Sequence, residues 1–94
     1  MPRRGGVKSI AREQMWYIYI IKSVLNNRYY IGCTSNIERR ILEHNNGYNI
    51  STKKDKPWKV VYCEEFNDQQ KAYSREKKIK SYKGGNAFKK LLNS

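Results

Sequence analysis

The sequence has few cysteines and histidines and contains no long hydrophobic run. Its 94 residues include two cysteines and one histidine, which is too small a set of ligands for a structural zinc site. A disulfide between Cys33 and Cys63 is not expected in a reducing compartment. We therefore expect both residues to be free thiols that pack as small apolar side chains.

No stretch of the sequence approaches the length of a transmembrane helix. The first residues, MPRRGGVKSIAR, also lack the apolar core of a secretory signal peptide. We therefore expect a cytoplasmic protein with no membrane partner.

Acidic residues are also scarce, because eight of them oppose 20 lysines and arginines and leave a formal charge of +12. So large an excess on a short chain indicates a polyanionic partner. Nucleic acid is the leading candidate, and an anionic membrane surface is the less favoured alternative. The lysines expected to contact phosphate are Lys53, Lys54, Lys77, Lys80 and Lys83. For those in the polar loop 47–57, a solvated charged surface is an equally good interpretation.

A chain of this length predicts one domain. With 38% hydrophobic residues, eight tyrosines and two tryptophans, it can bury a modest core. We assign residues 15–94 to this domain and residues 1–14 to a flexible basic arm. We expect a monomer, and a protein partner is a candidate source of specificity because so short a chain leaves no room for a targeting domain.

Local patterns predict an α+β fold. β-Branched and aromatic residues indicate the strands, and the Asn26-Asn27 pair predicts a hairpin turn between the first two. The predicted strands are 16–22, 29–31 and 58–66. Caps, apolar spacing and glycine stops indicate the helices, which are predicted at 36–46, 69–83 and 86–93. The order β-β-α-β-α-α predicts an antiparallel three-stranded sheet flanked by helices.

The stretch that follows the second strand reads as a tight turn and a helix start. Gly32 is expected to break the strand, where the backbone bends or another group approaches closely. Ser35 is the predicted N-cap of the helix. Glu38 lies three residues later, which completes the pattern of a capping box.

Four polar side chains are candidates for a common site. An even-numbered hairpin loop places Tyr19 and Tyr30 on the same face of the sheet, whereas an odd loop separates them. Arg40 and His44 are spaced i and i+4, so they share one face of the helix. Each also has a structural interpretation: the tyrosines as core aromatics, Arg40 in an ion pair within its helix, and His44 as an ordinary buried histidine.

Glu76 occupies an unexpected position in the last long helix. Ala72, Glu76, Ile79 and Lys83 follow the spacing of a buried stripe, so a carboxylate lies where an apolar residue is expected. Burying a carboxylate is costly unless it is paired or binds a metal. Glu76 is therefore expected either to find a basic partner or to serve a site.

Taken in order, these residues resemble the motifs of the GIY-YIG nuclease family. The triplets Tyr17-Ile18-Tyr19 and Tyr30-Ile31-Gly32 have their last and first tyrosines eleven positions apart, and Arg40, His44 and Glu76 follow. The resemblance covers roughly residues 15–83. It is closest to small single-domain members related to the N-terminal nuclease domain of the bacterial excinuclease C subunit. Tyr17 stands where the family name has glycine, a position that small members often vary.

The resemblance implies a metal-dependent endonuclease that hydrolyses DNA phosphodiester bonds, in repair or recombination, with structure-directed or weakly sequence-specific cutting. It implies that Glu76 holds a single Mg²⁺ or Mn²⁺ and that Arg40 contacts the scissile phosphate. Tyr19 is then the candidate general base, while His44 moves a proton or orients the water and Tyr30 lines the cleft. The alternatives are a non-catalytic nucleic-acid-binding module and an RNA- or ribosome-associated basic protein.

Overall fold

The structure is a computed structural model in which residues 14–93 are described. The predicted basic arm, residues 1–14, lies outside this range except for Gln14, so it stays a prediction. Across residues 14–93, no helix combines the length and the apolar character needed to cross a membrane.

Within these residues, three antiparallel strands form one sheet in the order β3-β2-β4. Strand β2 spans Trp16–Ser23, β3 spans Tyr29–Thr34 and β4 spans Trp58–Phe66. The central strand, WYIYIIKS, is continuously apolar up to its last two residues, because neighbours cover both its edges and helices cover both its faces.

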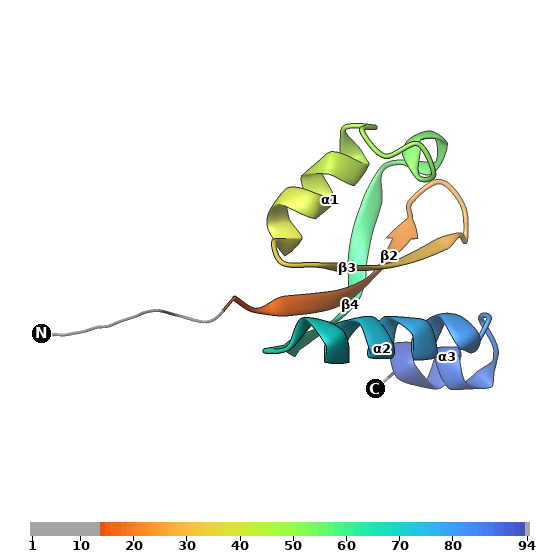
Figure 1. Cartoon of the computed structure of the whole chain (residues 1–94). Coiled ribbons are helices and arrows are strands. Elements are labelled where there is room, and N and C mark those ends of the chain that lie inside the picture. The colour runs from red at the N-terminus through yellow and green to blue at the C-terminus, as the bar shows by residue number, and fades with distance from the viewer. Residues whose placement is uncertain (1–13, 94) are drawn as a thin grey trace, which may run out of the picture.

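The helical elements lie on both sides of this sheet. They are α1 (Ile37–Asn45), the 3₁₀ turn η1 (Lys53–Asp55), α2 (Gln69–Ser81) and α3 (Asn86–Leu92). Figure 1 shows α1 on one side of the sheet and α2 with α3 on the other. The predicted α+β class and element order are therefore confirmed.

One face of β2 contributes to the apolar core under α2 and α3. Ile18 and Ile20 pack there with Ala72 and Ile79 of α2 and with Phe88 of α3. The first four of these residues are 0% exposed, and Phe88 is 4% exposed. This cluster joins the sheet to both C-terminal helices.

The other face of β2 packs under α1. Tyr19 and Ile21 form a cluster there with Trp58, and Ile37 and Ile41 of α1 cover it. Because side chains alternate along a strand, a single strand supplies both clusters.

The predicted capping box at the start of α1 is wrong. Asn36, rather than Ser35, has the extended backbone of an N-cap, and its Oδ1 accepts the N–H of Arg39 at 3.1 Å. The N–H of Asn36 in turn donates to Oγ1 of Thr34 at 3.1 Å. This bond ties Asn36 to the end of β3 and moves the cap one residue along the chain.

Candidate active site

Tyr19 and Tyr30 lie on the face of the sheet that α1 covers. In the β2–β3 ladder Tyr19 is opposite Gly32, and Ile21 is opposite Tyr30, so both tyrosines point to the same side. Their ring centroids are 6.4 Å apart. The placement predicted for an even hairpin loop is therefore confirmed.

Gly32 lets the side chain of Tyr19 lie across β3. A Cβ at this position would overlap the hydroxyl and the ring of Tyr19, so only glycine leaves room for it. The predicted close approach is present, but the predicted strand break is wrong, since β3 continues to Thr34. A side chain above the sheet makes the approach, and the ladder beneath it stays continuous.

His44 connects Tyr19 to the loop that follows α1. Its side chain is fully buried, as is Thr52. Nε2 lies 3.0 Å from the Tyr19 hydroxyl oxygen, and Nδ1 lies 2.7 Å from Oγ1 of Thr52. The rings of His44 and Tyr30 have centroids 4.9 Å apart. Sequence reasoning missed Thr52, because it sits in a polar loop with no motif around it.

Burial controls the protonation of this pair. It lowers the pKa of His44, and the positive charge of Arg40 lowers it further. Burial raises the pKa of Tyr19 to about 12, against the effect of Arg40 and with small additions from Tyr30 and Glu76. At neutral pH, Tyr19 therefore keeps its proton beside a neutral imidazole that is able to accept it.

Arg40 lies against the hydroxyl of Tyr19, and this polar contact is the largest cause that raises the pKa of Arg40. Nη1 also donates to Oε1 of Glu43 at 3.1 Å, so the ion pair expected within the helix is present. The side chain is still 38% exposed. Among the described residues, its buried Nε has no hydrogen-bond partner. Such a guanidinium is held in place yet retains donors for an oxyanion.

Glu76 lies on α2, and its charge affects the pKa values of Tyr19 and Cys33 on the sheet. Burial is the main cause that raises the pKa of Tyr19 and of Cys33, and the charge of Glu76 raises both further. Oε2 of Glu76 accepts from Nζ of Lys80 at 2.9 Å, and its side chain is 19% exposed. The basic partner expected as an alternative to a site is therefore present.

The donor set around Glu76 suits one kind of metal. Within residues 14–93, no cluster of three or more His, Cys, Asp or Glu side chains is able to hold an ion, which does not fit a zinc centre. A single, partly exposed carboxylate fits Mg²⁺, which keeps several waters and is completed by substrate phosphate. Lys80, which now pairs with Glu76, is 54% exposed and is free to move away.

The lysines predicted to contact phosphate are all exposed, namely Lys53, Lys54, Lys77, Lys80 and Lys83. The first two belong to η1, directly after Thr52. The prediction that Lys83 continues the buried stripe is wrong, because α2 ends at Ser81 and Lys83 has a positive φ of 51°. Phosphate binding by this set stays a prediction.

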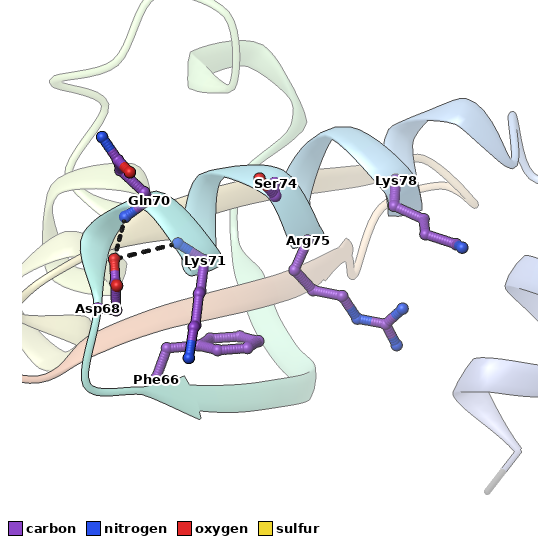
Figure 2. Close-up of a pocket in the computed structure, with 7 residues that line it drawn as sticks. All are labelled: Phe66, Asp68, Gln70, Lys71, Ser74, Arg75 and Lys78. Atoms are coloured by element: carbon purple, nitrogen blue, oxygen red, sulfur yellow. Dashed lines mark hydrogen bonds between the residues drawn. The ribbon is translucent and has the colours of Figure 1, made fainter.

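A separate groove runs along another flank of α2, beside Phe66 at the end of β4 (Figure 2). Lys71, Arg75 and Lys78 line it with Phe66. Arg75 contacts both carboxylate oxygens of Glu64, each at 2.9 Å, so its charge is neutralised within the fold. None of the predicted site residues lines this groove, and we regard it as distinct from the site.

These features define a small α+β domain with a buried tyrosine–histidine pair, an adjacent arginine and, on α2, a glutamate whose charge raises the pKa of that tyrosine. The family model for the GIY-YIG catalytic domain matches residues 15–89. The chain therefore belongs to the GIY-YIG family, as its motifs predicted, and this membership implies nuclease-type activity.

Relatives of similar size support the same assignment. A UPF0213 protein of Staphylococcus saprophyticus is 40% identical over 67 residues, which cover 70% of this chain and 80% of that protein. One of Clostridium perfringens is 43% identical over 67 residues, covering 70% and 71%. One of Haloquadratum walsbyi is 39% identical over 67 residues, covering 70% and 74%. Their names specify no substrate, so the reaction must be argued from the site.

Proposed function

We propose that the chain is a metal-dependent endonuclease that hydrolyses phosphodiester bonds in DNA. The observation that carries the proposal is the buried hydroxyl of Tyr19, 3.0 Å from His44 and in contact with Arg40. Hydrolysis of a phosphodiester needs a proton acceptor for the attacking water and a cation for the charge that develops on the phosphoryl oxygens. This cluster offers both.

Tyr19 and His44 act together on the proton. With a pKa of about 12, Tyr19 is too rarely ionised at neutral pH to act alone as a base. In the proposed step, Tyr19 takes a proton from the attacking water while its own proton passes to Nε2 of His44. The resulting hydroxide attacks phosphorus, the bond to the leaving oxygen breaks, and that oxygen takes a proton from solvent. Tyr30 packs on the His44 ring and holds it in place.

Arg40 has a second role in giving water access to Tyr19. Tyr19 is fully buried in this conformation, so its hydroxyl must be uncovered before water reaches it. Arg40 lies against that hydroxyl, and we propose that it turns outward to the scissile phosphate when DNA binds. The planar guanidinium matches two phosphate oxygens, which a lysine does not.

Glu76 is the proposed ligand of Mg²⁺ or Mn²⁺. When bound, such an ion polarises the phosphoryl oxygens as a Lewis acid. Glu76 gives up its ion pair with Lys80 to take this role. Lys80 is then available to the DNA backbone.

The substrate is proposed from the basic surface. Exposed lysines on and beyond α2 contact phosphate groups, and such contacts carry no sequence information. We therefore propose cutting that is directed by DNA structure or only weakly by sequence, as repair and recombination require. Binding is expected to weaken steeply as salt concentration rises.

The test is cleavage of labelled single-stranded, duplex, flap, forked and four-way-junction DNA, and of matched RNA, with Mg²⁺, Mn²⁺ or EDTA. We expect metal-dependent cutting of one or more DNAs and its loss in Glu76→Ala. Glu65→Ala is the matched control, because Glu65 is an exposed glutamate of β4 and its loss should leave cutting unchanged.

Two results would overturn the proposal. Salt-sensitive binding without cutting of any nucleic acid would identify a binding module. Cutting of RNA alone would exclude DNA as the substrate.

A further inference from the structure

Thr52 completes a buried chain of hydrogen bonds that begins at Tyr19. The Tyr19 hydroxyl lies 3.0 Å from Nε2 of His44, and Nδ1 of His44 lies 2.7 Å from Oγ1 of Thr52. All three residues are 0% exposed. In such surroundings each polar group must find its partner within the protein, so the direction of each bond is constrained.

The backbone of Thr52 is held on both sides. Its N–H donates to the carbonyl of Asn49 at 3.2 Å, and its carbonyl accepts from Nε1 of Trp58 at 2.9 Å. The hydroxyl donates to the same Asn49 carbonyl at 3.4 Å. With its proton directed at the Asn49 carbonyl, Oγ1 is able to accept from Nδ1 of His44, 2.7 Å away.

This arrangement selects one tautomer of His44. A neutral imidazole carries its proton on one nitrogen and a lone pair on the other. When Oγ1 of Thr52 accepts, Nδ1 carries the proton. Nε2 is then the nitrogen with the lone pair, and it faces the hydroxyl of Tyr19.

We propose that Thr52 is a positioning residue that holds His44 in the Nδ1–H tautomer, so that Nε2 receives the proton of Tyr19. The proposal rests on the proposed nuclease function and adds a residue that touches neither substrate nor metal. Without the Thr52 acceptor, the imidazole proton moves to Nε2 and donates to the Tyr19 oxygen. His44 then has no lone pair for the Tyr19 proton, although both residues are still present.

The test compares Thr52→Val, which keeps the shape and removes the acceptor, with Thr52→Ser, which keeps the hydroxyl. We expect kcat to fall at least about tenfold in the valine variant, with KM for DNA unchanged, and to recover in the serine variant. Ser51→Ala is the matched control, because Ser51 is the exposed neighbour in the same loop. Equal kcat in Thr52→Val and wild type would overturn the proposal.

A second readout does not depend on cleavage. His44 is the only histidine in the chain, so the imidazole ¹⁵N resonances in an NMR spectrum report its tautomer without ambiguity. We expect Nδ1–H in the wild type and in Thr52→Ser, and a shift toward Nε2–H in Thr52→Val. An Nε2–H wild type, or an unchanged tautomer in Thr52→Val, would overturn the proposal. This measurement decides the role of Thr52 even if the wild type cuts no DNA.

Discussion

The two faces of the sheet are made by alternate residues of the same strand, yet they are built on different principles. Ile18 and Ile20 face α2 and α3 in an apolar cluster. Tyr19, between them, faces α1 and bonds to the buried His44, whose other nitrogen bonds to Thr52. Both faces exclude water, but the polar side chains that are 0% exposed among residues 14–93, His44 and Thr52, lie on the second.

The difference indicates where stability and chemistry reside. Apolar burial is non-directional and depends mainly on the area removed from water, so the α2–α3 face tolerates exchanges of similar volume. Buried polar groups are costly when one partner is lost, so the α1 face depends on the identity of each side chain. We therefore expect substitutions in the apolar cluster under α2 and α3 to change mainly stability, and substitutions in the polar network of Tyr19, His44 and Arg40 to change mainly activity.

The largest effect is expected from Ile79→Ala on the apolar face. Removing this fully buried side chain should lower the free energy of unfolding by about 2–5 kcal/mol, measured by urea denaturation. Leu42→Ala is the control, because Leu42 is 62% exposed and its loss should cost no more than about 0.5 kcal/mol. If the folded Ile79→Ala protein cut DNA more than about tenfold slower, the two faces would not be independent.

Arg40→Ala is expected to have the converse effect. Losing a preorganised charge should lower kcat at least ~10²-fold, with an unfolding midpoint close to that of the wild type. Arg39→Ala is the matched control, since Arg39 is 73% exposed and also pairs with Glu43. Arg40→Lys should restore little activity, because it lacks the planar fork. Full activity in Arg40→Lys would show that charge alone suffices.

Gly32→Ala tests whether the α1 face is sensitive to shape as well as to charge. The new methyl group displaces the Tyr19 ring, so we expect a loss of about 1–3 kcal/mol in stability together with a loss of cleavage. Gly84→Ala is the comparison, because Gly84 has a φ of 73° and open space around it. It should cost about 1–2 kcal/mol in backbone strain and leave cleavage of the folded protein unchanged. Equal cleavage by both variants would contradict this account of Gly32.

The smallest expected effect is a pH dependence of stability near neutral pH that comes from His44 on the α1 face. The folded state lowers the pKa of His44 from 6.5, so the unfolded chain binds a proton at higher pH than the folded chain. Stability is therefore full above about pH 6.5 and falls as the pH drops below it, by at most ~1.4 kcal/mol per pH unit. Urea denaturation at about pH 7.5, 6.5 and 5.5 should show this slope. It should be absent in His44→Gln, and an equal slope in that variant would assign it to other groups.

Much of the fold could be predicted because its signals are local. Strand β4 has the predicted bounds, since its β-branched and aromatic residues lie between a proline and a helix cap. Helix α2 begins after Asp68, whose side chain accepts from two N–H groups of the first turn, as a capping aspartate should. The residue at which α1 begins was harder to predict, because serine and asparagine are both good N-caps and Ser35 and Asn36 are adjacent. A bond from Asn36 to Thr34, which sequence spacing does not show, decided between them.

The site was predictable in its motif residues and not in their supporting contacts. Strand alternation placed Tyr19 and Tyr30 on one face for an even hairpin loop but not for an odd one, and spacing placed Arg40 and His44 on one face of a helix. The bond between His44 and Thr52 depends on how the loop after α1 folds back, and no local pattern encodes that path.

The close approach of the Tyr19 ring to Gly32 constrains how these two positions can change in evolution. The ring of Tyr19 occupies the space that a side chain at position 32 would need. A lineage that gained bulk at position 32 would have to give up the aromatic ring at position 19, and with it the hydroxyl that faces His44. The two positions should therefore vary together or not at all. Relatives that lack this glycine are therefore the first in which we expect the activity to be lost.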